Sequence, residues 1–177
     1  MCGPRGASAR RRADVTPGGP AFREALAALT PQLRGFARFL ARDAARADDL
    51  VQETLLRALE HAGTWQEGTV LRAWLFRILR NAFVDEERRR GTERRGLAAM
   101  PRPTAAAPGQ AAATELDDLA RGLSELPAPQ REALVLVAAL GFEVSEAAAV
   151  TGVAEGTVKA RVSRARAALA RRFGPRG

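Results

Sequence analysis

The chain has 177 residues, which is enough for one ordinary domain or two small ones. Hydrophobic residues make up 46% and charged residues 27%, a balance that supports a packed core and excludes a wholly disordered chain. The formal net charge is +8 at pH 7 and the sequence pI is about 11.4, so we expect an anionic partner: nucleic acid, an anionic membrane surface or an acidic protein.

Single copies of cysteine and histidine restrict the available chemistry. Cys2 has no second cysteine for an intrachain disulfide or a zinc site, and any histidine-dependent catalysis or metal site would have to use His61. Lys159 is the only lysine among the 28 basic residues. Such arginine use suits phosphate and base contacts, although genomic G+C bias explains it equally well. We expect no metal and no cofactor.

The sequence predicts a cytoplasmic protein without membrane insertion. The longest strongly apolar run, residues 133–140, is too short to span a bilayer. Residues 1–20 contain three consecutive arginines but no apolar segment after them, so they do not resemble a secretory signal. They are expected to form a disordered basic tail, and a misplaced start codon would explain them as well.

Helical periodicity begins after this tail. Apolar residues recur at steps of three and four between Phe22 and Leu40, which predicts one face of a helix. Pro31 is expected to kink this helix or to begin a second one capped by Thr30.

Two more helices are expected before residue 92. Asp48-Asp49 is predicted to open the first of them, because acidic groups are favoured at the positive end of the helix dipole, and Gly63 to stop it. Its predicted buried residues are Leu50, Thr54, Leu55, Ala58, Leu59 and Ala62. A polar loop at 64–69 leads to a long helix over 70–90, terminated by Gly91.

A change of composition divides the chain. Residues 92–114 carry prolines, glycines and two alanine triplets without any period, which predicts a linker. The fold class is therefore predicted to be all-α: two small helical domains, residues 21–91 and 115–173, joined by a flexible linker. The second domain is expected to contain a short helix from Glu115, helices at 131–140 and 145–151 with Ser145 as N-cap, a turn at 152–154, and a helix from Glu155 to Phe173.

The end of the second domain predicts a helix-turn-helix. A short helix, a turn with Gly152 and a basic helix follow one another, and the basic helix has a stripe of buried residues: Val158, Val162, Ala165 and Leu169. Its outer surface is left with Thr157, Lys159, Arg161, Arg164 and Arg166. The first three are candidate base contacts and the last two candidate phosphate contacts. A solvated basic face on an ordinary four-helix bundle is the alternative.

One edge of the 70–90 helix mixes an aromatic ring, an amide and cations. The residues are Trp74, Arg77, Asn81, Asp85 and Arg88. Aromatic rings stack on unpaired bases and arginines neutralise phosphates, so this edge suits single-stranded or opened DNA. A core role for Trp74 and a solvated end at 88–90 are the alternatives.

An acidic face is predicted around residues 48–53. Asp49, Gln52 and Glu53 share one side of a helix, and in so basic a protein they are suited to a basic protein partner rather than DNA. Helix capping and solubility would explain them equally well.

These motifs resemble those of bacterial extracytoplasmic-function (ECF) sigma factors. Residues 48–54 and 73–81 look like sigma region 2, whereas 126–127, 130–133 and 156–166 look like sigma region 4. The resemblance covers about residues 22–172 in the family's order. Within the family, residues 134–142 and the last helix most resemble the alphaproteobacterial general-stress-response (EcfG-like) group.

The resemblance implies a promoter-recognition subunit that binds core RNA polymerase and promoter DNA, takes no small-molecule substrate and is held by an anti-sigma factor. Contacts with the β′ clamp helices would come from Asp48, Asp49, Gln52, Glu53 and Arg57, and the second domain would meet the β flap. The minus-thirty-five element would be read by Thr157, Lys159, Arg161, Arg164 and Arg166. The minus-ten element would be read and opened by Trp65, Trp74, Arg77, Asn81, Asp85, Arg88 and Arg89.

Two other functions are considered from the residues. A stand-alone helix-turn-helix regulator would bind duplex DNA without polymerase, but it would need neither the acidic face nor the Trp74 edge. A small hydrolase using His61 and Asp48 would lack both a nucleophile motif and a glycine-rich phosphate loop. The sequence therefore favours a sigma factor over an enzyme.

Overall fold

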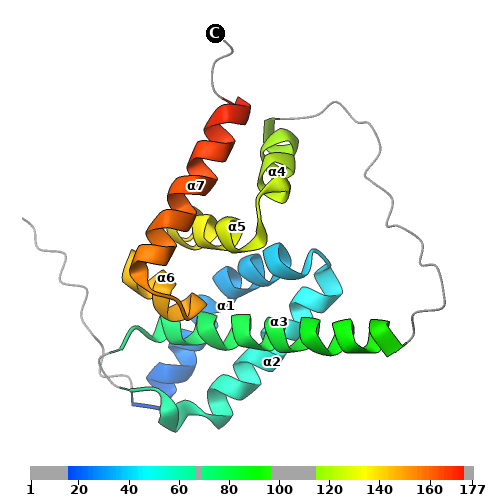
Figure 1. Cartoon of the computed structure of the whole chain (residues 1–177). Helices are drawn as coiled ribbons and strands as arrows, with labels where there is room; N and C mark the ends of the chain where they lie inside the picture. The colour runs from blue at the N-terminus through cyan, green and yellow to red at the C-terminus, as the bar shows by residue number, and fades with distance from the viewer. Residues whose placement is uncertain (1–15, 67–68, 97–114, 174–177) are drawn as a thin grey trace, which may run out of the picture. The chain divides into compact units, whose positions relative to one another are not determined.

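The computed structural model describes residues 16–66, 69–96 and 115–173, and every regular element within these ranges is a helix (Figure 1). The predicted all-α class is confirmed. The helices form two compact units, one ending at Leu71 and the other beginning at Arg72. Across the described ranges, no helix combines the length and the apolar character needed to span a membrane.

The first unit is built on a pair of helices joined by a tight turn. Its elements are α1 (Pro20–Ala41), α2 (Ala44–Glu60) and the 3-10 turn η1 (Ala62–Thr64). Arg42 takes the left-handed conformation at φ 56°, and the Asp43 carboxylate accepts the backbone N–H of Arg46 at 2.8 Å. Because Asp43 caps α2, the helix begins before Asp48, and the expectation that Asp48-Asp49 opens it is wrong.

α1 continues through Pro31, so neither the second helix nor the Thr30 cap is formed. The Thr30 hydroxyl instead donates to the carbonyl of Leu26 at 2.9 Å. Leu26, Leu33 and Phe36 lie on both sides of the proline, and all three are buried. Packing of one continuous apolar face therefore outweighs the loss of one backbone hydrogen bond.

α3 (Leu71–Gly96) is longer than predicted. It passes through Gly91 and ends five residues later, supported by an Arg90–Glu86 ion pair at 3.7 Å and by the Thr92 hydroxyl bonded to the helix backbone. A glycine inside a helix costs only about 1 kcal/mol, which neighbouring helix formers offset. The remainder of the predicted linker, residues 97–114, and the predicted tail at 1–15 lie outside the described residues.

The C-terminal part of the second unit packs around α7. Its elements are α4 (Glu115–Glu125), α5 (Ala128–Leu134), the π-helical turn η2 (Val135–Ala139), α6 (Val144–Thr151) and α7 (Glu155–Phe173). α5 and α6 both lie against α7 (Figure 1). In η2 the N–H of Leu140 bonds to the carbonyl of Val135, five residues back, at 2.9 Å. The single helix predicted for 131–140 is therefore an α-helix that ends in a wider turn.

The cap of α6 differs from the prediction. The N-cap is Glu143, not Ser145, and the Glu146 carboxylate accepts the backbone N–H of Glu143 at 2.9 Å. Glutamate three residues into a helix can reach back to the cap in this way, as in a capping box. The helix consequently starts at Val144, one residue earlier than expected.

Two arginines of α3 are bound within the second unit. Arg80 Nε lies 2.7 Å from the Glu132 carboxylate. The Arg72 guanidinium donates to the carbonyl of Leu140 and lies 3.9 Å from the centroid of the Phe142 ring. Burial lowers the pKa of Arg72, because water solvates the charged form less well there.

Candidate nucleic-acid interface

Helices α6 and α7 and the turn between them form the predicted helix-turn-helix. Gly152 ends α6 in the left-handed conformation at φ 68°, and its N–H bonds to the carbonyl of Ala148 at 2.8 Å. The N–H of Val153 bonds to the same carbonyl, and the N–H of Thr157 reaches Ala154 at 2.9 Å to start α7. Glycine adopts this φ without the strain that a side chain would add, so the short turn is specified locally.

The inner face of α7 is apolar and closely packed. Val158 and Ala165 are fully buried and Val162 is nearly so, as predicted, whereas Leu169 is only half-buried. Ala147 of α6 is fully buried as well, and small residues of this kind let the two helices approach closely. This packing fixes the rotation of α7 and hence which of its side chains point outward.

Each of the predicted contact residues on α7 is at least partly accessible. Lys159, Arg164 and Arg166 are exposed, whereas Thr157 and Arg161 are half-buried. Arg164 Nε donates to the carbonyl of Ala160 on its own helix at 3.2 Å, which leaves the rest of its guanidinium available. α7 therefore presents a basic outer surface of the kind that binds a DNA groove.

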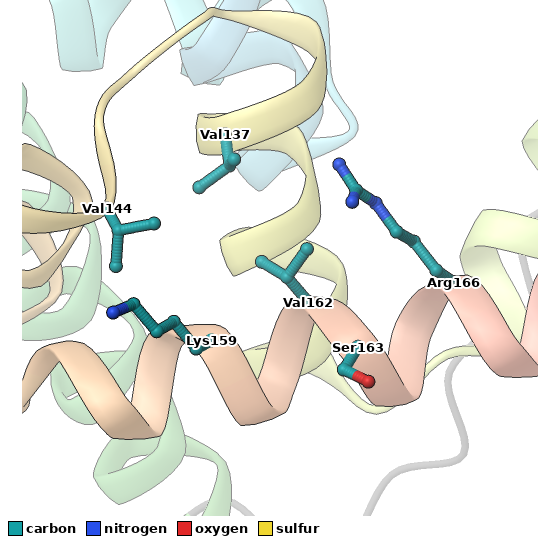
Figure 2. A pocket seen from close by; sticks show the side chains of 6 residues that line it. All are labelled: Val137, Val144, Lys159, Val162, Ser163 and Arg166. Atoms are coloured by element: carbon teal, nitrogen blue, oxygen red, sulfur yellow. The ribbon is translucent and has the colours of Figure 1, made fainter.

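The basic residues of α7 do not all lie on one side. Lys159 and Arg166 line a groove of about 320 Å³ together with Ser163 (Figure 2). Its apolar lining consists of Val137, Val144 and Val162. The helical period places Thr157, Arg161 and Arg164 away from this groove. The groove could not be predicted from the sequence, because Val137 comes from the π turn and Val144 from the shifted start of α6.

The predicted edge of α3 is mostly exposed. Trp74 is half-buried and takes part in side-chain interactions of its own. Asp85 lies near two of the cations: its carboxylate is 3.9 Å from Arg88, and its backbone carbonyl accepts from Arg89 Nε at 3.4 Å. The exposed members of the edge are Arg77, Asn81, Asp85, Arg88 and Arg89. The edge thus offers cations and an amide to an anionic ligand.

Trp65, which was expected to contact the minus-ten element, lies in the core of the first unit. Its side chain is 6% exposed and its ring lies 5.9 Å from that of Phe22. A tryptophan ring has a large apolar area, and burying that area against the helix pair is more favourable than leaving it exposed in a polar loop. Trp65 is therefore a packing residue in this structure, and its ring is too deeply buried to stack on a base.

α2 carries the predicted acidic face. Asp49, Gln52 and Glu53 are exposed, and Glu53 pairs with Arg57 at 2.7 Å on the same helix. Asp48 is half-buried, and its carboxylate lies 3.0 Å from Arg34 Nε of α1. The acidic face is consequently ordered but remains accessible.

Two leucines extend this face in a way that the sequence did not indicate. Leu56 is 56% exposed and Leu59 is 45% exposed, although Leu59 was expected in the buried stripe. Val51 and Ala47 are buried instead, because the helical period places them with Leu50, Thr54 and Ala58 on the core-facing side of α2. Leu56 follows Glu53 by three residues, so acidic and apolar groups share one surface. An accessible leucine pair of this kind is typical of a protein-binding surface.

The described residues contain no group of histidine, cysteine and acidic side chains that could hold a metal ion. His61 is exposed at the end of α2, where its backbone caps the helix.

Models of two protein families match the chain in succession. Sigma-70 region 2 matches residues 26–93, and sigma-70 region 4 matches residues 116–169. The first covers α2 and most of α1 and α3, and the second covers α6 and most of α7.

Individual relatives agree with these matches. The ECF RNA polymerase sigma factor EcfG of Rhodopseudomonas palustris is 47% identical over 149 residues, covering 84% of this chain and 82% of that protein. SigM of Mycobacterium tuberculosis is 37% identical, covering 81% and 72%. Among solved structures, the sigma factor RpoE of Bartonella quintana, in complex with the anti-sigma factor NepR, matches with a TM-score of 0.73 and 39% identity, covering 87% of this chain and 98% of that one.

Proposed function

This chain belongs to the ECF sigma factors, which bind core RNA polymerase and direct it to promoters, and we propose a role in that task for each of its exposed surfaces. The observation that carries the proposal is the ordered pair of sigma regions on one chain, each with its own exposed charged helix. In this proposal the protein performs no chemistry itself and works in the cytoplasm, where the polymerase is.

We propose that α7 reads the minus-thirty-five element as duplex DNA. Lys159, Arg164 and Arg166 are exposed cations on a helix held by a helix-turn-helix, and Arg161 and Thr157 lie at its N-terminal half. Arginine can bond bidentately to guanine in the major groove, whereas the more C-terminal cations are better placed for phosphates.

The exposed edge of α3 is proposed to meet the minus-ten element. Arg77, Asn81 and Arg88 supply hydrogen-bond donors to bases and phosphates, and the half-buried ring of Trp74 keeps part of its surface for stacking. We propose domain bounds of 21–91 for region 2 and 115–173 for region 4, which the family matches at 26–93 and 116–169 support.

The acidic and apolar surface of α2 is proposed to hold the β′ clamp helices of the polymerase. Asp49, Gln52 and Glu53 would steer a basic partner, and Leu56 would supply the apolar contact at its centre. Region 4 would in turn meet the β flap.

An anti-sigma factor is proposed as the regulator, since the Bartonella relative is held by one. The identity to EcfG supports a place in the general-stress-response group. A stand-alone DNA-binding regulator is disfavoured because region 2 and the α2 surface would have no use in it.

Run-off transcription tests the proposed function. Purified core polymerase is supplied with a pooled genomic promoter library, with and without this protein. We expect discrete new transcripts that share an upstream motif. Salt-sensitive duplex binding by the protein alone, without any new transcript, would favour the stand-alone regulator.

Substitution of Arg161 tests the assignment of α7. Arg161→Ala is expected to weaken recognition by about 1–3 kcal/mol at one base pair of the minus-thirty-five element and to relax the preference there. Arg164→Ala serves as the comparison and should weaken binding to all DNA sequences alike. If Arg161→Ala instead lowered the affinity for every DNA sequence equally, Arg161 would be a phosphate contact.

A further inference from the structure

The outer side of α1 carries a row of arginines near its C-terminal end. Arg34, Arg38 and Arg42 recur every four residues, and all three are exposed. Residues four apart lie on one side of a helix, so the row extends over about 12 Å. Arg34 is held by the carboxylate of Asp48 on α2, at 3.0 Å. The guanidinium groups of Arg38 and Arg42 form no ion pair or hydrogen bond with the residues that the structure describes, so both are available to a partner.

Arg42 occupies a backbone conformation that a side chain disfavours. Its φ is 56°, and every other positive φ in the described ranges belongs to a glycine. This left-handed conformation brings Cβ close to the following carbonyl oxygen, and glycine or asparagine tolerates it better. The turn between α1 and α2 requires the angle but not an arginine. Residues held in such conformations cluster at functional sites, which directs attention to the Arg42 side chain.

Helix stability accounts for only part of this arrangement. Cations near the C-terminal end of a helix are favoured by its dipole, and Arg38 already supplies one in the last turn of α1. The effect on exposed groups is small and is screened by salt. It gives no reason to place a second arginine at the position where the backbone disfavours one.

The Arg34–Asp48 ion pair joins this row to the acidic and apolar surface of α2. Asp48 directly precedes Asp49 and lies one helical turn before Gln52, which are both part of the surface proposed for the polymerase contact. The chain reverses within two residues between α1 and α2, and the two helices pack together. Arg38 and Arg42 therefore lie beside the first turn of α2, at the border of that surface.

A partner that covers both helices has to carry both signs of charge. The phosphate backbone of DNA is uniformly negative, and the exposed carboxylates of Asp49 and Glu53 would repel it. A protein surface can instead present basic groups to α2 and acidic groups to α1. Neighbouring patches of opposite sign also fix the orientation of a partner, because any other orientation brings like charges together.

We propose that Arg38 and Arg42 bind an acidic segment of core RNA polymerase next to the segment that α2 contacts. The inference rests on the proposed function of α2 and adds a second contact to it. Arginine can bond to a carboxylate through two parallel N–H groups, which adds direction as well as attraction. In this arrangement α2 supplies the main contact, and the two arginines fix how region 2 is turned on the polymerase.

Charge reversal tests the two arginines. Arg38→Glu and Arg42→Glu are each compared with the unchanged full chain by surface plasmon resonance on immobilised core polymerase. The Kd should rise at least about tenfold for each variant at low salt, and the difference should shrink as the salt concentration rises. Arg23→Glu is the matched control, because Arg23 is an exposed arginine of α1 that lies about 22 Å along the helix from Arg38. It should change the Kd less than about twofold.

Two further substitutions separate binding from folding. Arg42→Asn suits the left-handed conformation but removes the cation, so the urea midpoint should stay the same or rise while the Kd increases about fivefold. Arg42→Lys keeps the cation and should remain within about threefold of the unchanged chain. A loss of affinity in the asparagine variant without a loss of stability cannot come from misfolding.

Three results would overturn the inference. Arg23→Glu could weaken polymerase binding as much as the other two reversals, or both reversals could bind polymerase as well as the unchanged chain does. The two reversals could also bind polymerase normally but weaken the promoter complex, which would assign the arginines to DNA. If the unchanged chain failed to bind core polymerase at all, the proposed function itself would be contradicted, so the two failures are distinguishable.

Discussion

The two tryptophans of the chain have different surroundings, and these surroundings define different roles. Trp65 is almost fully buried beside Phe22, and its indole N–H has no hydrogen-bond partner within the described structure. Trp74 keeps part of its ring accessible on α3. Identical side chains thus serve packing in one place and a candidate stacking surface in the other.

Trp65→Ala is expected to destabilise the protein by about 3–5 kcal/mol, because it removes a large buried ring and leaves a cavity. Trp65→Phe keeps most of the volume and removes the unpaired N–H, so it should cost less than about 1.5 kcal/mol. Urea unfolding followed by circular dichroism measures both changes. A base-reading role for Trp65 would be supported instead if the alanine variant were stable but defective in promoter opening.

Gly152 illustrates how a turn depends on one backbone angle. Its φ of 68° lies in the left-handed region, and an added Cβ would meet no atom within 4 Å. Gly152→Ala therefore tests conformational strain alone, and we expect a loss of about 1–2 kcal/mol. Native-state hydrogen exchange of the α7 amides measures this loss.

Gly156→Ala is the matched control for that measurement. Gly156 also has open space around its Cβ position but lies inside α7 without a positive φ. Alanine there should leave stability unchanged or raise it by up to about 1 kcal/mol. If both alanine variants were equally destabilised, the cause would not be the left-handed conformation of Gly152.

At the scale of single elements, the residues of α2 that stabilise the fold and those proposed to bind a partner lie on different sides of the helix. Its inner residues, such as Thr54 and Ala58, are fully buried, and the Thr54 hydroxyl donates to the carbonyl of Leu50 at 2.7 Å. Its outer leucines contribute little to the core because about half of each side chain is exposed. These exposed leucines and the acidic face beside them make up the surface that we propose for the polymerase contact.

Leu56→Ser is expected to change the free energy of unfolding by less than about 0.5 kcal/mol, as for other surface substitutions. It should weaken binding to core polymerase at least about fivefold, since a central apolar contact is lost. Surface plasmon resonance with immobilised core enzyme measures the affinity. Val70→Ser, at a similarly exposed apolar residue just before α3, should leave polymerase affinity unchanged. Equal losses for both variants would contradict an α2-specific contact.

Helix α7 could be predicted from the sequence because the residues that specify it are close together in the chain. Valines at helical spacing, a glycine at the turn and cations elsewhere specify a buried face and a basic outer face without reference to distant residues. The stripe from Val158 to Ala165 is confirmed for that reason.

The sequence patterns did not predict the features that depend on tertiary packing. Pro31 is a helix breaker by propensity, yet the buried residues around it keep α1 continuous. The exposure of Leu59 depends on which side of α2 packs against α1, and the apolar spacing within α2 alone does not specify that side. The groove beside α7 depends on a π turn, whose pattern of apolar residues is the same as that of a regular helix.

At the scale of the whole molecule, two recognition surfaces are joined by one covalent connection. The region 2 and region 4 matches end and begin on either side of residues 94–115. Each surface alone meets only part of a promoter. Linkage makes the second contact intramolecular, so the combined affinity exceeds that of either surface through effective concentration.

Cutting that connection should therefore abolish promoter selection while leaving both regions folded. A protease site replaces residues 104–109, and the purified protein is tested before and after cleavage. We expect the uncut protein to transcribe normally, and the cut protein to need about 10²–10⁴ times more region 4 fragment to restore the same run-off signal. Far-UV circular dichroism should be unchanged by cleavage, because the cut lies between the helices that end at Gly96 and begin at Glu115. Undiminished transcription after cleavage would mean that the polymerase, rather than the chain, holds the two regions in place.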